Sequence, residues 1–205
     1  MAEDGVRVVC LDAMGVLYRS ADDMRELLVP FVQARAARAD EEIHELYRRC
    51  SRGEFSSAHL WESLGVPGDA EALDDAYLAA HRLNDDALLF IERCRALEIK
   101  VACISNDVSE WSVWLRQRFK LDTAIVPWVI SGDHKSRKPE RQIFERLIEA
   151  IGGTTHGALV VDDREPNLDA ASAIGFGTVL FGGASNRHRA VRGFRELVEL
   201  VSGQA

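Results

Sequence analysis

The chain has 205 residues, of which 47% are hydrophobic and 28% charged, a composition typical of a globular protein with one or two domains. This balance does not suggest an intrinsically disordered chain. The net charge of -8 and the isoelectric point near 5.3 argue against a nucleic-acid or anionic-membrane partner, because both require a basic face.

The cysteines and the start of the chain indicate a cellular compartment. Cys10, Cys50, Cys94 and Cys103 show neither a Cys-x-x-Cys pair nor metal-ligand spacing with histidine, so we expect buried, reduced thiols. The acidic start, residues 1–4, is not typical of a signal peptide, and no apolar run is long enough to span a bilayer. We therefore expect a cytoplasmic protein, and the sequence indicates no oligomeric state.

The first predicted element is a buried strand at residues 8–11. This valine-rich run is too short for a helix, and it ends on the carboxylate of Asp12, with Gly15 in the turn that follows. Ligands bind at the carboxyl ends of the strands in an open parallel sheet. Asp12 therefore lies where chemistry is expected.

Residues 22–82 show helical periodicity and few strand signals. Four amphipathic series are present, at residues 27–35, 43–47, 60–64 and 73–80. We therefore predict a helical cap over residues 21–83, inserted into a core formed by residues 1–20 and 84–205. The cap arginines, which include Arg48, Arg49 and Arg52, are expected on a solvated face, and contact between one of them and a substrate stays an open alternative.

From Asp85 onward, helical and strand patterns alternate, which predicts a parallel sheet with helices on both faces, a Rossmann-like α/β core. Further strands are expected at residues 101–104, 124–130, 158–161 and 178–181, and a C-terminal helix includes Val191. Asp107-x-x-Glu110 is typical of a capping box, so we expect Asp107 to cap a helix. Pro139 suits the first turn of the next helix.

Three predicted strands end on polar groups. Asp12 follows the first strand, Ser105 and Asn106 follow the second, and Asp162-Asp163 follow the fourth. The ends of parallel strands lie along one edge, where three acids would repel one another without a cation. Hard carboxylate oxygens without histidine or thiolate neighbours favour Mg²⁺.

A cation for a phosphoryl group is available just beyond the third strand. Lys138 is expected at a helix N-terminus, where it can neutralise phosphate charge. The hydroxyl of Ser105 and the amides that follow it would hold phosphate oxygens. His134 belongs to the same loop, so we expect it close to Lys138.

These residues resemble the four motifs of the haloacid dehalogenase superfamily, in order and over nearly the whole chain. The resemblance implies that Asp12 is a nucleophile, Ser105 the hydroxyl of the second motif and Lys138 the lysine of the third. Asp162-Asp163 followed by Asn167 matches the fourth motif, with Asp163 the main metal ligand and Asp162 an accessory. Mg²⁺ would also be bound by Asp12 and by the backbone carbonyl of Met14. The helical insertion would close over the site.

Met14 departs from the commonest first motif, which has a second aspartate as general acid/base at this position. Three functions follow. The first is a Mg²⁺-dependent phosphohydrolase that acts on a small phosphorylated metabolite through an aspartyl-phosphate, weakened by Met14. The second is a 2-haloacid dehalogenase, in which halide leaves without a proton, although such enzymes usually lack the acidic pair. The third is an inactive descendant that binds a ligand or a protein.

Overall fold

The computed structural model describes residues 5–203, which contain a six-stranded parallel sheet. The strands are β1 (Val8–Leu11), β2 (Lys100–Ser105), β3 (Trp128–Ile130), β4 (Ala158–Asp162), β5 (Gly177–Phe181) and β6 (Arg189–Val191). Their order is β3-β2-β1-β4-β5-β6, so β1 lies between β2 and β4. Strands β2 and β3 extend the sheet on one side of β1, and the later strands β4, β5 and β6 extend it on the other side. This sheet confirms the predicted Rossmann-like α/β class.

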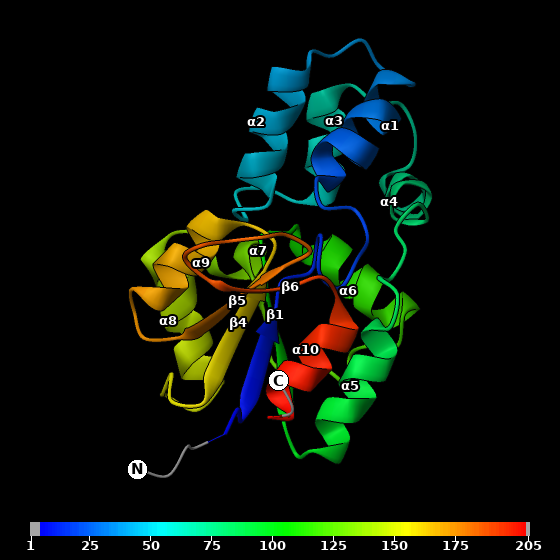
Figure 1. Ribbon diagram of the computed structural model, residues 1–205. Helices are drawn as coiled ribbons and strands as arrows, with labels where there is room; N and C mark the ends of the chain where they lie inside the picture. The colour runs from blue at the N-terminus through cyan, green and yellow to red at the C-terminus, as the bar shows by residue number, and fades with distance from the viewer. Residues whose placement is uncertain (1–4, 204–205) are drawn as a thin grey trace.

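Helices fall into two groups. Between β1 and β2 lie η1 (Met24–Leu28), α1 (Val29–Gln33), α2 (Asp40–Cys50), α3 (Ser57–Leu64) and α4 (Ala70–Leu78). The remaining helices are α5 (Ala87–Ala96), α6 (Ser109–Arg118), α7 (Ser131–His134), α8 (Arg141–Ala150), α9 (Glu165–Ser172) and α10 (Phe194–Val201). We call residues 21–83 the helical insertion, and Figure 1 shows its helices beyond the carboxyl ends of the strands.

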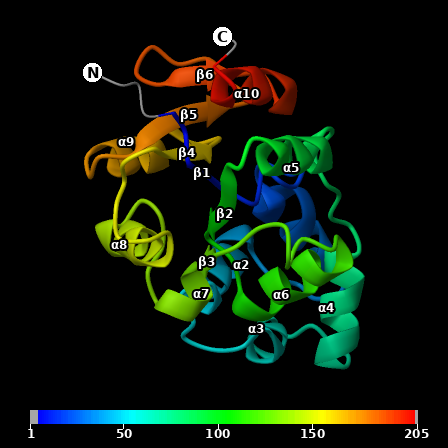
Figure 2. The same ribbon diagram turned by 90° about the horizontal axis from the view of Figure 1, so that it is seen from below.

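The sheet is covered on both faces. Figure 2 shows α8 and α9 on one face and α5, α6 and α10 on the other. Successive side chains of β1 alternate between them, since Val8 and Cys10 pack in the cluster with α8 and α9 whereas Val9 and Leu11 pack in the other cluster. Burial on both faces explains why β1 is apolar throughout.

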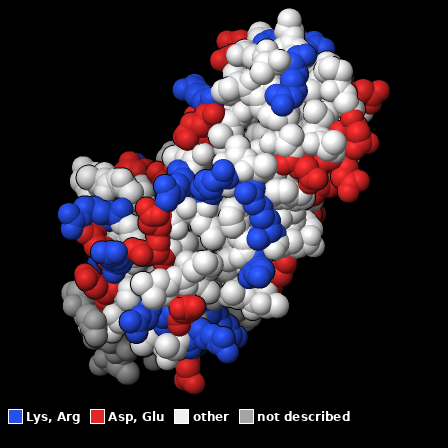
Figure 3. Space-filling model, turned by 90° about the vertical axis from the view of Figure 1, so that its right-hand side faces the viewer, with Lys and Arg blue, Asp and Glu red and all other residues white. Residues whose placement is uncertain are grey.

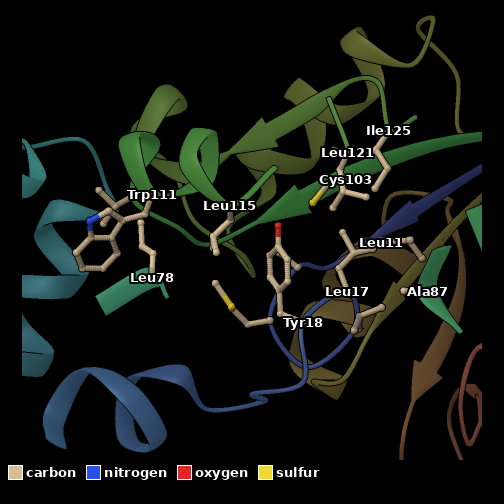
Figure 4. Close-up of a cluster of buried hydrophobic side chains, with 14 of the residues drawn as sticks. Leu11, Leu17, Tyr18, Leu78, Ala87, Cys103, Trp111, Leu115, Leu121 and Ile125 are labelled. Atoms are coloured by element: carbon tan, nitrogen blue, oxygen red, sulfur yellow. The ribbon is translucent and has the colours of Figure 1, made fainter. Parts of the chain in front are cut away.

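The helical insertion shares a hydrophobic core with the sheet. The cluster that contains Leu11 also contains Leu78 of α4 and Trp111 of α6. In Figure 4, Tyr18 lies between the side chains of the sheet and those near Trp111. This shared packing places the insertion firmly against the core.

A contact between two backbones also sets the position of the insertion. Gly53 follows α2, and a Cβ atom added to it would lie 2.1 Å from the carbonyl oxygen of Gly132 in α7. Gly53 also has a φ of 70°, which favours glycine. No side chain fits between these two segments.

Several predicted boundaries are corrected by the structure. The third strand is shorter than residues 124–130, because Pro127 has no N–H for the ladder and pairing begins at Trp128. The predicted C-terminal helix does not include Val191, which instead ends β6 and pairs with Phe181 of β5. Strand β6 was missed because it has only three residues, two of them exposed.

Two predictions about helix starts are also wrong. The N-cap of α6 is Val108, and no side-chain hydrogen bond caps this helix. The carboxylate of Asp107 instead accepts a hydrogen bond of 2.7 Å from the N–H of Val108, immediately next to it. Helix α8 begins at Arg141, so Pro139 lies before the helix and Lys138 is not at its N-terminus.

Within the described residues, no helix combines the length and the apolar character needed to cross a membrane. The four cysteines are free and buried, as expected.

Candidate active site at the strand ends

Three carboxylates meet at the ends of two neighbouring strands. Asp12 follows β1, while Asp162 ends β4 and Asp163 comes next. The N–H of Asp12 donates to the carbonyl of Val161 at 2.9 Å, so pairing between the strands continues to Asp12. One oxygen from each of the three carboxylates lies within 4.8 Å of the others. The expected acidic cluster is therefore present.

Lys138 bridges two of these acids. Its Nζ atom lies 2.8 Å from Oδ2 of Asp12 and 2.7 Å from Oδ2 of Asp162. Burial lowers the pKa of the Lys138 ammonium, but the two carboxylates outweigh this effect and raise it. Burial raises the pKa of Asp12 to about 7, opposed by Lys138 and reinforced by the charges of Asp162 and Asp163. The half-exposed guanidinium of Arg164 lies 4.0 Å from Oδ1 of Asp163. Three carboxylates against one ammonium and one guanidinium still leave the cluster short of positive charge.

The two acids of the fourth motif differ in their hydrogen bonding. Asp162 accepts bonds from Lys138 at 2.7 Å, from the N–H of Arg164 at 2.9 Å and from the amide of Asn167 at 3.0 Å. Among the described residues, the buried Oδ1 atom of Asp163 accepts no hydrogen bond. Burial, followed by the charge of Asp162, raises the pKa of Asp163 to about 6. Asp163 is thus the acid that is free for a further ligand.

The cluster fits a divalent cation. Its donors are hard carboxylate oxygens, the type that Mg²⁺ prefers, and the unbonded Oδ1 of Asp163 is an available ligand atom. Gly15 makes room for this group, because a Cβ atom there would lie 2.3 Å from Oδ2 of Asp163. With a φ of 76°, Gly15 also adopts a backbone conformation that favours glycine.

Ser105 and Asn106, at the end of β2, have different surroundings. The hydroxyl of Ser105 is buried and has no hydrogen-bond partner among the described residues, so it is free to donate to a ligand. Both ends of the Asn106 side-chain amide are engaged by Lys138. Its Oδ1 accepts the N–H of Lys138 at 2.7 Å, and its Nδ2 donates to the carbonyl of Lys138 at 2.9 Å. Asn106 therefore holds the lysine's backbone in place.

A cavity of about 670 Å³ lies between this strand edge and the helical insertion. The core contributes Asp12, Met14, Ser105, Asn106, Arg137, Arg164 and Asn167. The insertion contributes Ala21, Asp22, Asp23, Met24, Arg25, Asp40, Glu41, His44, Glu45, Tyr47 and Arg48. On the face shown in Figure 3, acidic side chains gather along one edge of the insertion, while charges of both signs are interspersed over the core.

The cap arginines have separate surroundings. Arg48 lines the cavity and pairs with Glu45, and Arg49 pairs with Glu54 at 2.7 Å within the insertion. Arg52 forms an ion pair with Glu140 of the core. Of these three arginines, Arg48 is the one that lines the cavity, where Arg25 of the insertion also lies.

His134 does not join the site. It lines a separate hollow together with Trp128 and Lys135, because α7 carries it away from the cavity. The expectation that it lies with Lys138 is wrong.

Sequence reasoning missed two charged residues on the cavity wall, the half-buried Arg137 and the buried Asp23. Arg137 donates to the hydroxyl of Ser51, and its guanidinium lies 5.7 Å from the ring centre of Tyr47, so burial lowers its pKa. Asp23 is buried at the start of η1. The position of Arg137 next to Lys138 was an available signal. No sequence signal pointed to Asp23, because its burial depends on how the insertion packs against the core.

A family profile described as haloacid dehalogenase-like hydrolase matches residues 6–175, most of the chain. The chain belongs to the haloacid dehalogenase-like hydrolase family. This confirms the family that the motifs indicated, and with it a hydrolase fold. A search of curated proteins finds no significant match.

Solved structures of haloacid dehalogenase (HAD) proteins share the fold. A HAD phosphatase from Thermococcus onnurineus has a TM-score of 0.76 at 18% identity, covering 97% of this chain and 99% of its own. A HAD family enzyme from Bacteroides thetaiotaomicron, in complex with magnesium and inorganic phosphate, has a TM-score of 0.74 at 20% identity, covering 89% and 98%. L-2-haloacid dehalogenase from Xanthobacter autotrophicus has a TM-score of 0.69 at 17% identity, covering 98% and 100%. Both chemistries therefore occur on this fold.

Proposed function

We propose that this protein is a Mg²⁺-dependent phosphohydrolase that acts on a small phosphorylated metabolite. The observation that carries the proposal is the excess of negative charge at the strand ends. Three carboxylates there face two cations, the buried ammonium of Lys138 and the half-exposed guanidinium of Arg164. A halide-displacing enzyme has no use for a third acid here, whereas a cation and a phosphoryl group both complement this arrangement.

Each residue of the strand ends has a role in this proposal. Asp163, Asp12 and the Met14 carbonyl would hold Mg²⁺, with Asp162 as an accessory ligand that mainly positions Lys138. When bound, Mg²⁺ supplies charge neutralisation for the phosphoryl oxygens. The unbonded hydroxyl of Ser105 and the Lys138 ammonium would contact non-reacting phosphate oxygens.

The reaction proceeds in two displacements. A carboxylate oxygen of Asp12 attacks phosphorus and the bond to the leaving-group oxygen breaks, which gives an aspartyl-phosphate. Water then attacks phosphorus, and the bond to Asp12 breaks to release inorganic phosphate. The ammonium of Lys138, 2.8 Å from Asp12, holds the nucleophile and favours its ionised form.

Phosphate release from a panel of alkyl and aryl phosphates, with and without Mg²⁺, tests the proposal. Wild-type protein is expected to turn over at least one ester only with Mg²⁺, and Asp12→Asn is expected to abolish turnover. Asp133→Asn, which removes an exposed carboxylate outside the cavity, serves as the matched control. Absence of turnover across the panel, or full activity in Asp12→Asn, would contradict the proposal.

A 2-haloacid dehalogenase is the second candidate, and Met14 favours it. A thioether lines the cavity where a proton donor is usual, and displacement of halide needs no proton. Chloride release from 2-chloropropionate by wild-type protein, without Mg²⁺ and absent in Asp12→Asn, would support this candidate. Tight binding of a phosphorylated ligand without turnover of any ester would instead identify a binding protein.

A further inference from the structure

The proposed reaction lacks an obvious proton donor. When an alkyl phosphate is cleaved, the leaving oxygen develops negative charge, and its protonation in the transition state accelerates the step by about 10²–10⁴-fold. Met14 lines the cavity with only 8% of its surface exposed, and its thioether cannot supply a proton. If the proposed function holds, the proton comes from water, from the substrate or from another group on the cavity wall.

Burial separates the candidate donors. Among the carboxylic acids that the insertion contributes to the cavity, Asp40, Glu41 and Glu45 are exposed and Asp22 is half-buried. Asp23 alone among these carboxylic acids is buried, with 7% of its surface exposed, whereas His44 on the same wall is half-buried. A buried carboxyl group is the type that enzymes keep protonated near neutral pH.

Tyr47 is the other buried acid that the insertion places on the cavity wall, but it is already engaged. Its hydroxyl donates to the carbonyl oxygen of Asn106 at 3.2 Å. Burial, together with the charges of Asp23 and Asp107, raises the pKa of Tyr47 well above its ordinary value of 10. A phenol with so high a pKa is a poor donor at neutral pH.

The surroundings of Asp23 favour a carboxyl group that can both hold and release a proton. Burial raises its pKa to about 6, Met24's N–H and the charges of Arg164 and Arg137 oppose the shift, and Asp22 adds to it. The charged and titratable groups that act on it or respond to it come from both parts of the molecule: Asp22, Tyr47, Tyr77, Asp107, Arg137 and Arg164. Among the described residues, no basic side chain lies within ion-pair distance of Asp23.

We propose that Asp23 is the proton donor to the leaving-group oxygen and so fills the role that Met14 cannot. As the Asp12 oxygen bonds to phosphorus and the ester P–O bond breaks, the Asp23 proton passes to the departing oxygen, and the alcohol leaves neutral. Asp23, now a carboxylate, accepts a proton from the water that attacks the aspartyl-phosphate. One ester and one water thereby give one alcohol and one phosphate, and both carboxyl groups return to their starting states.

A comparison of two esters distinguishes proton donation from a structural role. In a single turnover, Asp23→Asn is expected to release the alcohol of the best alkyl phosphate about 10²–10⁴-fold more slowly than wild-type protein. Release of nitrophenolate from p-nitrophenyl phosphate is expected to be much less affected, because nitrophenolate leaves without a proton. A single turnover excludes hydrolysis of the aspartyl-phosphate, which the two esters share. The control, Asp133→Asn, removes an exposed carboxylate outside the cavity and is expected to leave the ratio of the two rates unchanged. Adding Met14→Asp to Asp23→Asn is expected to restore alkyl phosphate hydrolysis.

The pH dependence of wild-type protein gives a measurement that needs no variant. The ratio compared is that of the single-turnover rates of alcohol and nitrophenolate release, which report the first displacement only. Ionisation of Asp12 affects both esters alike, so it cancels in this ratio. That ratio is expected to be highest below the pKa of Asp23, near 6, and to fall as the pH rises through it, because the donor loses its proton.

Each outcome has one meaning. Equal loss of the single-turnover release rate on the two esters in Asp23→Asn, or a wild-type ratio that is flat with pH, would overturn the assignment of Asp23 while the proposed function stands. Absence of phosphate release by wild-type protein from either ester would instead be a failure of the proposed function, and the assignment would fall with it.

Discussion

The two walls of the cavity differ in how their charges are held. On the core side, the ammonium of Lys138 lies 2.7–2.8 Å from two buried carboxylates, and Asn106 holds the backbone of the lysine. On the insertion side, most charged residues are exposed, and Arg48 pairs with Glu45 of its own helix. The core wall is therefore preorganised for one chemistry, whereas the insertion wall presents adaptable groups to the rest of a substrate.

The largest effect is expected when the ammonium of Lys138 is removed from the core side of the cavity. Lys138→Met leaves two neighbouring carboxylates buried without their cation, so the free energy of unfolding is expected to fall by about 3–5 kcal/mol in EDTA. Phosphate release is expected to fall by about 10²–10³-fold. Urea denaturation measures the first effect. Lys135→Met, on the exposed lysine of the same loop, is the control, and similar unfolding curves for the two variants would contradict the prediction.

An intermediate effect is expected at Gly15, in the turn that follows β1 and lies next to Asp163. In Gly15→Ala, the new methyl group would overlap Oδ2 of Asp163, and the residue would keep a φ of 76°. We expect weaker Mg²⁺ binding by isothermal titration calorimetry and a loss of unfolding free energy beyond the roughly 1–2 kcal/mol of a left-handed alanine.

Gly182 supplies the control for this substitution. Its φ is 75° and a Cβ atom there would meet nothing within 4 Å, so Gly182→Ala isolates the backbone cost. If both alanine variants bound Mg²⁺ like the wild type, the proposed role of Asp163 would be wrong.

The smallest effect is expected at the ion pair that joins the two walls. Arg52 and Glu140 are 35% and 38% exposed, so Arg52→Gln is expected to reduce the free energy of unfolding by at most about 1 kcal/mol. Hydrogen exchange of the backbone around Gly53 is expected to accelerate, because the insertion loses a contact with the core. Arg49→Gln, whose partner Glu54 lies within the insertion, should lack this acceleration. Equal rates of hydrogen exchange in both variants would show that the Arg52–Glu140 ion pair does not hold the insertion against the core.

Residues on the core wall were accessible to sequence reasoning because strand ends are visible in the pattern. Each of β1, β2 and β4 is a short apolar run that ends on polar residues, and parallel pairing brings these ends together. Asp12, Ser105 and Asp163 were therefore found without coordinates. The hydrogen bonds between the side chain of Asn106 and the backbone of Lys138 were not predicted. A contact between a side-chain amide and another loop leaves no periodic pattern in the sequence.

The insertion wall was poorly predicted for a physical reason. Helical periodicity located its helices, but the angle at which they pack on the sheet decides which charged residue becomes buried. Asp23 is buried while the adjacent Asp22 is not, and no local pattern separates the two. His134 was misplaced for a similar reason, because the short helix α7 turned it away from Lys138.

The contact between Gly53 and Gly132 has a consequence for engineering. Because it joins two main chains without side chains, its spacing does not depend on which residues line α2. Exposed positions such as Asp40, Glu41 and Glu45 are therefore suited to combinatorial libraries that alter substrate preference, with both glycines kept invariant. A bulkier residue at position 53 would instead lift the whole insertion and change every contact in the cavity together.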